Sequence, residues 1–147
     1  MNRKKRTDSI KVGLINARSV CNKAALIFDY LTENDFDIFF VTETWVQNND
    51  EPILAQVVPE DYDYLVQCRH GNSGGGIMVI FKDNFNMKKA VAIQYKSFEL
   101  LEVTTTVSNQ LVRFLTIYRP PPSKKNKLTF TMFKDEFQNF AMEKKSL

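Results

Sequence analysis

The sequence has little cysteine, a single histidine and no long apolar run. Cys21 and Cys68 lack CxxC spacing and a flanking histidine pair, so neither a zinc site nor a disulfide framework is indicated. No apolar run approaches the roughly 20 residues that a membrane span requires, and the charged N-terminus leads into a strand pattern instead of a signal peptide. We therefore expect a soluble intracellular protein, nuclear or cytoplasmic, with no membrane partner.

The composition indicates one folded domain. The 147 residues are 44% hydrophobic and 12% aromatic, which is ample for a packed core. The 20 Lys and Arg against 17 Asp and Glu give a net charge of +3, compatible with a polyanion partner but not diagnostic of one. Basic residues gather at 3–6, 124–127 and 144–145, where a solvated chain end is the ordinary explanation and nucleic-acid contact or nuclear targeting the alternative. We divide the chain into a basic arm, residues 1–9, and a domain, residues 10–147.

Apolar periodicity predicts a β-α-β unit at the start of this domain. Residues 11–16 and 37–42 are nearly continuous apolar runs, which is typical of strands buried on both faces. Apolar residues recur at helical spacing between them, with Asn22 as the predicted N-cap of a helix that ends at Glu33. A short helix is predicted over residues 52–58, where proline suits the first turn.

The remainder of the chain predicts antiparallel strands and a last helix. Gly, Asn, Asp and Ser separate short strand-like runs, and residues 107–110 have the composition of a tight hairpin turn. The prolines at 120–122 cannot continue a strand because they lack an amide donor, and a helical face follows over residues 129–144. The predicted strands are residues 62–67, 76–81, 89–95, 98–107 and 111–118. Together these elements predict an α/β fold with a mixed β-sheet and flanking helices.

Two polar side chains, Asn16 and Glu43, follow the first two predicted strands. Ligands of open α/β sheets gather at the carboxyl ends of the strands, where both residues fall. A carboxylate there suits Mg²⁺, which takes a few carboxylate oxygens plus water and substrate phosphate. A salt bridge or solvent exposure explains Glu43 equally well from position alone, and an asparagine after a strand is more often a turn former or a helix cap.

The glycine triplet at residues 74–76 is not a phosphate-binding loop. It precedes a predicted strand instead of opening a helix, and no Gly-Lys-Ser or Gly-Lys-Thr sequence follows it. His70, the only histidine, is predicted to be a surface loop residue. Trp45 is assigned to packing in preference to base stacking.

Four short motifs occur in the order and approximate spacing that they have in one protein family. They are Leu14-Ile-Asn-Ala-Arg-Ser19, Thr42-Glu-Thr-Trp45, Arg69-His-Gly-Asn-Ser-Gly-Gly-Gly-Ile77 and Ile117-Tyr-Arg-Pro-Pro121. Residues 11 to about 140 thereby resemble the endonuclease/exonuclease/phosphatase superfamily, and more narrowly the apurinic-endonuclease-like domain of non-LTR retrotransposons, which nicks target DNA. The resemblance implies one half of a deoxyribonuclease I-like four-layer α/β sandwich.

The resemblance also implies roles for individual residues. Asn16 would be the active-site asparagine that helps arrange the metal, Glu43 the ligand of Mg²⁺, and Tyr118 the tyrosine whose hydroxyl contacts the scissile phosphate of DNA. Three arginines are candidates for contacts with backbone phosphates, each weighed equally against a solvated or structural role: Arg18, Arg69 and Arg119.

Other groups of the family are missing from this sequence. The resembled enzymes hydrolyse phosphodiesters with a divalent ion and with an Asp-polarised His that activates water. Their Asp-Phe-Asn and Ser-Asp-His motifs do not occur here, and no histidine follows His70. We therefore expect the N-terminal half of an endonuclease domain, inactive alone, with weak or absent Mg²⁺ binding. Its apolar sheet surface would be exposed unless the missing half or another chain covers it.

Three functional hypotheses remain, and the enzymatic status of the chain stays open. The first is a portion of a Mg²⁺-dependent DNA endonuclease. The second is a non-enzymatic remnant that at most binds nucleic acid through its basic residues. The third, a phosphatase of the same superfamily, is less favoured because the sequences of residues 14–19 and 42–45 resemble the retroelement branch.

Overall fold

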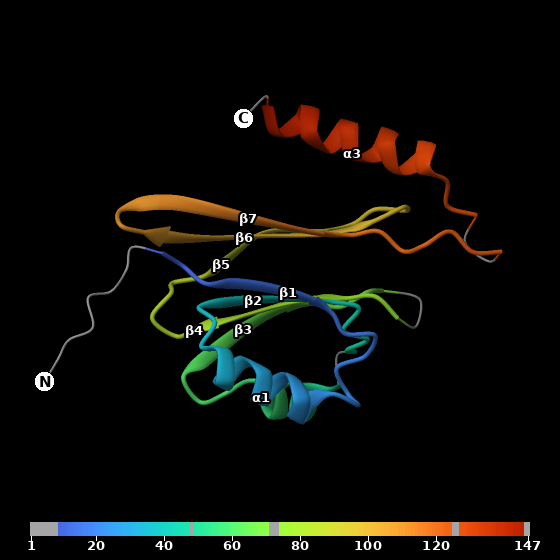
Figure 1. Cartoon of the computed structure of the whole chain (residues 1–147). Coiled ribbons are helices and arrows are strands. Elements are labelled where there is room, and N and C mark those ends of the chain that lie inside the picture. The colour runs from blue at the N-terminus through green and yellow to red at the C-terminus, as the bar shows by residue number, and fades with distance from the viewer. Residues whose placement is uncertain (1–8, 48, 71–73, 125–126, 146–147) are drawn as a thin grey trace, which may run out of the picture.

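The computed structural model describes residues 9–47, 49–70, 74–124 and 127–145. In Figure 1 the chain forms four stacked layers, which are a pair of helices, a sheet, a second sheet and a last helix. Nearly all of the predicted basic arm lies outside the described residues. The predicted α/β sandwich is confirmed.

The first sheet is mixed, as predicted, and has the strand order β1-β2-β4-β3. Strands β1 (Val12–Asn16) and β2 (Ile38–Thr42) are parallel, which completes the predicted β-α-β unit. Strand β4 (Ile77–Lys82) lies antiparallel between β2 and β3 (Tyr62–Gln67). Every residue of β2 is buried, which explains its continuous apolar sequence.

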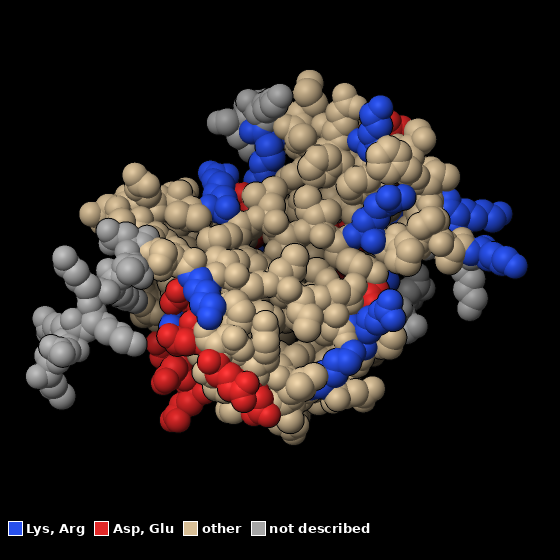
Figure 2. Space-filling model, in the orientation of Figure 1, with Lys and Arg blue, Asp and Glu red and all other residues tan. Residues whose placement is uncertain are grey.

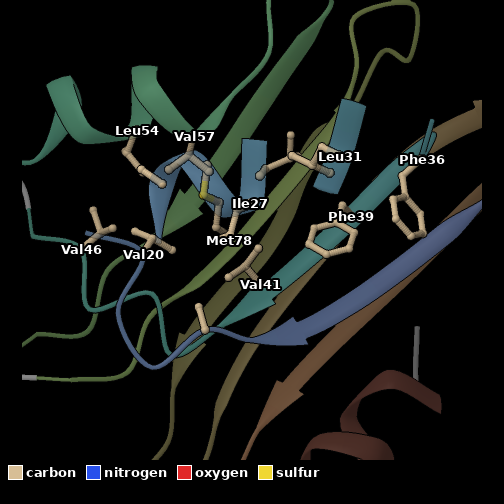
Figure 3. Close-up of a cluster of buried hydrophobic side chains, with 13 residues drawn as sticks. Val20, Ile27, Leu31, Phe36, Phe39, Val41, Val46, Leu54, Val57 and Met78 are labelled. Carbon is tan, nitrogen blue, oxygen red and sulfur yellow. The ribbon is translucent and has the colours of Figure 1, made fainter. Parts of the chain in front are cut away.

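Helices α1 (Ala24–Asn34) and α2 (Glu51–Val57) cover one face of this sheet. Figure 3 shows the buried cluster between helices and sheet, in which Leu31 lies close to Phe39 and Leu54 lies beside Val57 at the other end of the cluster. Helix α2 carries a proline in its first turn, as predicted.

The predicted N-cap Asn22 is wrong, because Lys23 occupies the cap position and makes no side-chain cap hydrogen bond. The Lys23 amide donates to the carbonyl of Val20 at 3.0 Å, which closes a turn before the helix. The Lys23 ammonium donates to the carbonyls of Ala17 and Arg18. These contacts connect the start of α1 to the loop after β1. The preference for Asn, Asp, Ser or Thr as an N-cap does not predict them.

A second sheet of three antiparallel strands stacks on the first. It contains β5 (Lys88–Gln94), β6 (Glu99–Val107) and β7 (Gln110–Tyr118). The predicted hairpin turn between β6 and β7 is confirmed, with Ser108 and Asn109 both at positive φ. An apolar cluster joins the two sheets: Ile38, Phe40, Ile77, Val79, Phe81, Met87, Leu101, Val103 and Tyr118.

Helix α3 (Phe130–Lys145) covers the outer face of the second sheet. Its aromatic side chains pack with Phe98 and Leu100 in a third cluster. The Glu136 carboxylate accepts hydrogen bonds from the amides of Lys96 and Ser97 at 3.0 and 3.2 Å, which fixes the turn between β5 and β6 to the helix. Four layers are therefore present within this one chain.

The predicted burial of residues 11–16 on both faces is wrong, because β1 is an edge strand whose alternate side chains are exposed. Val12 and Leu14 are 44% and 68% exposed, although they alternate with Gly13 and Ile15, which face the helix layer. An apolar groove of about 510 Å³ follows this strand and the neighbouring face of α1. The prediction that the sheet surface stays uncovered is wrong for most of the inner face, because strands of the same chain cover it, and it holds only at this edge strand.

Among the described residues, no helix is both long and apolar enough to cross a membrane.

Candidate active site

The predicted site lies where β1 and β2 end side by side. Asn16 and Thr42 are partners in the parallel register, and the Ala17 amide donates to the Thr42 carbonyl at 2.9 Å. Glu43 directly follows Thr42, the last residue of β2. The structure therefore brings Asn16 and Glu43 to one edge of the sheet, as the sequence predicts.

The chain turns sharply after β2 and holds Glu43 in an unusual backbone conformation. Glu43 has a φ of 54° and Trp45 a φ of 56°, in the left-handed region that costs about 1–2 kcal/mol for a residue with a Cβ. The Glu43 carbonyl accepts a hydrogen bond from the Ser19 amide at 2.8 Å, and the Trp45 amide donates to the Gly75 carbonyl at 2.8 Å. The two flanking loops thus hold the conformation. Such concentrated strain is a common property of functional sites.

Tyr118 approaches this strand end from the second sheet. It is the last residue of β7, and its hydroxyl donates a short hydrogen bond to the Glu43 carboxylate. Burial raises the pKa of Tyr118 above the ordinary 10.0, and the hydrogen bond and charge of Glu43 raise the pKa further. The hydroxyl therefore keeps its proton near neutral pH and remains a hydrogen-bond donor.

Glu99, which the sequence analysis did not select, is a second contact between the sheets. It is the register partner of Tyr118, and its side chain is only 4% exposed. Its carboxylate pairs with the Arg69 guanidinium at 2.8 Å and accepts the Gly76 amide at 3.0 Å. A carboxylate within an otherwise apolar strand sequence, Phe98 to Leu101, was the available signal. Together, Glu43–Tyr118 and Glu99–Arg69 join the two sheets at the site.

The glycine triplet fits closely around these contacts. Gly74, Gly75 and Gly76 all have positive φ, and a Cβ on Gly75 would lie 2.1 Å from Arg69 Nε. A Cβ on Gly76 would lie 2.4 Å from the hydroxyl oxygen of buried Thr44. The positive φ of all three residues and the close approach of Thr44 to Gly76 favour glycine in this turn into β4, so the triplet has a structural role at the site and is no helix-opening phosphate loop.

The three candidate phosphate-binding arginines have different surroundings. Arg69 is engaged by Glu99, and the Arg119 guanidinium lies over the rings of Phe130 and Phe133 at 5.4 and 5.2 Å. Arg18 is exposed, and its amide donates to Asn16 Oδ1 at 3.3 Å. Two of the side chains thus have structural partners, and the predicted phosphate contacts of all three remain predictions.

His70 and Trp45 lie near the site in the exposed loops. His70 is exposed, as predicted, and its amide donates to Gln94 Oε1 at 3.0 Å. The expectation that Trp45 is a packing residue is only partly met, because the side chain is 46% exposed.

The site offers one carboxylate and one amide side chain to a metal ion. Within the described ranges, no group of three or more His, Cys, Asp or Glu side chains is placed to hold a metal. Mg²⁺ nevertheless binds proteins through one or two carboxylates and completes its shell with water and substrate phosphate. Glu43 and Asn16 fit that mode of binding.

A search against family models finds no match for this chain. Among curated proteins, the chain is 26% identical over 119 residues to the RNA-directed DNA polymerase from the mobile element jockey of Drosophila melanogaster. The match covers 79% of this chain and 12% of that protein. The relative belongs to a mobile element, which agrees with the retroelement resemblance of the sequence.

Solved structures share the fold at low sequence identity. TDP2 from D. rerio, complexed with a single strand DNA product, has a TM-score of 0.59 and 14% identity, over 90% of this chain and 54% of that chain. The catalytic domain of human Nocturnin has a TM-score of 0.56 and 13% identity, over 90% and 59% of the two chains. The AP endonuclease LMAP from Leishmania major has a TM-score of 0.54 and 9% identity, over 73% and 38%. The chain thus spans less than two thirds of the length of these structures. It has the deoxyribonuclease I-like fold that these structures share.

Proposed function

We propose that the chain is part of a Mg²⁺-dependent endonuclease domain of a non-LTR retrotransposon, with DNA as its substrate. The observation that carries this proposal is the hydrogen bond between Tyr118 and Glu43. It joins a carboxylate suited to a metal and a hydroxyl suited to a phosphate, at the strand ends where this fold class binds ligands. The mobile-element relative supports the retrotransposon assignment.

Each residue would contribute a separate part of phosphodiester hydrolysis. Glu43 and Asn16 would hold Mg²⁺, which when bound stabilises negative charge on the phosphate and the leaving oxygen. The Tyr118 hydroxyl, which keeps its proton, would donate to a non-bridging phosphate oxygen. Glu99 would hold Arg69 and the glycine turn against the second sheet through its ion pair with Arg69 and its hydrogen bond from the Gly76 amide.

The same proposal implies that this chain does not complete the reaction by itself. Its only histidine, His70, lies in an exposed loop and bonds through its amide to Gln94. No Asp-polarised His is therefore provided to activate water. Hydrolysis by the isolated chain is expected to be at background level.

The distribution of charge supports nucleic acid as the substrate class. In Figure 1, β1, β2 and β7 run toward the right of the view, where the candidate site lies. Acidic side chains gather at the lower left in Figure 2, whereas Lys and Arg are spread over the top and right of this face. The larger acidic region of this face thus lies at the opposite end of the strands from the candidate site.

The open edge of β1 is the proposed contact with the rest of such a domain. Val12 and Leu14 are exposed on an inner sheet face, next to the apolar groove between β1 and α1. An exposed apolar edge strand favours association with another strand. We propose that the occupant is the part of the endonuclease domain that this chain lacks, supplied by the same protein or by a partner.

The experiment is an assay for nicking of supercoiled DNA with Mg²⁺, using the isolated chain and a chimera. In the chimera, the chain is followed by the segment that comes after the matched region in the jockey protein. We expect background nicking by the isolated chain and Glu43-dependent nicking by the chimera, with Glu43→Ala as the control in both.

Two results would contradict parts of the proposal. Glu43-dependent nicking by the isolated chain would show that it is not inactive. A chimera whose circular dichroism shows that it is folded, but whose nicking is unchanged by Glu43→Ala, would refute the assigned site. A folded chimera with no nicking but with DNA binding would favour the non-enzymatic remnant.

A further inference from the structure

Trp45 is a large aromatic residue whose side chain is exposed to solvent close to the candidate site. It lies two residues after Glu43, is 46% exposed and has a φ of 56°, which is rare for a bulky residue. Burial of an indole ordinarily compensates for local strain, yet almost half of this side chain faces solvent. Packing alone therefore does not explain why the chain holds Trp45 in this position.

Two backbone hydrogen bonds fix the main chain at Trp45. The Trp45 amide donates to the Gly75 carbonyl at 2.8 Å, and the Thr44 amide donates to the Gly76 carbonyl at 3.3 Å. Thr44 between them is fully buried. Thr44 thus anchors the loop, and Trp45 projects from a backbone that is already ordered and has little freedom to lose on binding.

One edge of the indole packs against the glycine turn, beside a cation. The position of a Cβ on Gly74 is 3.5 Å from Trp45 Nε1 and 3.8 Å from Arg69 Nη1. The indole is 46% exposed and lies two residues after Glu43, whose carboxylate accepts the Tyr118 hydroxyl. An exposed aromatic ring this close in sequence to a group proposed to face a phosphate is suited to a flat ring that is covalently attached to that phosphate.

We propose that Trp45 stacks on an unpaired nucleobase adjacent to the phosphate that Glu43 and Tyr118 receive. The proposal rests on the proposed function for the position of that phosphate, but it makes a separate claim about binding. Every nucleobase has an aromatic face, so such a platform tolerates different sequences and favours single-stranded or locally unpaired DNA over a perfect duplex. Trp45 is then a positioning and specificity residue of the site.

The sequence offers a direct probe, because Trp45 is the only tryptophan in the chain. Intrinsic tryptophan fluorescence therefore reports on this position alone. The chain is titrated in EDTA with a short single-stranded oligothymidylate and with a fully paired hairpin, while the anisotropy of a dye on the DNA reports binding independently. Free N-acetyl-tryptophanamide, titrated in parallel, corrects for absorption by the DNA.

Three variants separate stacking from bulk and from general surface effects. Trp45→Phe keeps an aromatic face, Trp45→Leu keeps apolar bulk only, and Tyr30→Leu removes an aromatic ring with the same 46% exposure on α1. We expect Trp45→Leu to weaken binding of the single strand by about 5- to 150-fold, Trp45→Phe to retain most of it, and Tyr30→Leu to have no effect.

The expected result for the unmodified chain is quenching of Trp45 that follows the anisotropy curve, at lower DNA concentration for the single strand. Binding without quenching would overturn the proposal, as would equal affinity of Trp45→Leu or absence of binding to either DNA. Because the assay contains no metal and measures no hydrolysis, its outcome is independent of the nicking assay. Quenching with a failed nicking assay would leave the base platform in place and refute only the endonuclease function.

Discussion

The buried ion pair between Arg69 and Glu99 should make a large contribution to stability. The two side chains are 16% and 4% exposed, and their charged atoms are 2.8 Å apart. In Glu99→Gln, the amide oxygen can still accept the Gly76 amide, but the Arg69 charge loses its counterion in a site that water scarcely reaches. The substitution thus isolates the charge of the pair from its hydrogen bond to the glycine turn.

The expected loss can be estimated from the burial of the pair. Removing one member of a buried pair costs about 3–5 kcal/mol, and the partial exposure of Arg69 places this case near the lower end, at about 3 kcal/mol. For a domain of this size, about 3 kcal/mol lowers Tm by about 6–12 °C. Urea unfolding followed by circular dichroism measures the free energy, and a thermal scan measures the shift in Tm.

Two further variants test the reasoning. Glu60→Gln neutralises an exposed carboxylate and should change stability by no more than about 0.5 kcal/mol. The double variant Arg69→Met with Glu99→Gln removes both charges and should recover much of the loss, because no uncompensated charge stays buried. A loss of less than about 0.5 kcal/mol for Glu99→Gln, or a double variant less stable than Glu99→Gln alone, would refute this account of the pair.

Three other predictions follow from the same geometry. Gly76→Ala should destabilise the fold by about 1–3 kcal/mol in urea unfolding, because its φ is 90° and the new Cβ would meet the Thr44 hydroxyl; an unchanged midpoint would contradict this. Because the folded pKa of Tyr118 is raised above 10.0, its contribution to stability is complete below pH 10 and is lost as the pH rises toward the folded pKa. The unmodified chain should therefore lose stability above pH 10 more steeply than Tyr118→Phe, and parallel curves would exclude the coupling. Leu14→Lys should reduce self-association in analytical ultracentrifugation without lowering Tm, since Leu14 is 68% exposed, and unchanged association would exclude β1 as the associating edge.

Local sequence patterns are sufficient to predict most elements of this fold. The apolar runs of β1 and β2, the hairpin turn before Gln110 and the aromatic face of α3 all appear where periodicity and turn chemistry place them. The pairing of strands within each sheet is harder to predict from sequence. The residues of β5 to β7 form a separate sheet stacked on the first, and local alternation does not specify whether a strand extends a sheet or starts another.

The candidate site was predictable only where its residues lie at motif positions. Asn16, Glu43 and Tyr118 were selected, and the structure brings the ends of their three strands to one region. Glu99 was missed because its importance depends on two partners far away in sequence, Arg69 and the Gly76 amide. A cation's partner is set by tertiary contacts, and sequence alone therefore left the role of each arginine open.

The most direct test of the assigned site is paramagnetic broadening of amide resonances by Mn²⁺, which substitutes for Mg²⁺ at oxygen ligands. The proposed function predicts that broadening on titration is strongest around Glu43 and Asn16, and that Glu43→Gln abolishes it there while the rest of the spectrum is retained. Broadening centred elsewhere, such as at buried Glu102, or broadening near Asn16 that survives Glu43→Gln, would contradict the assignment of Glu43 as the metal ligand.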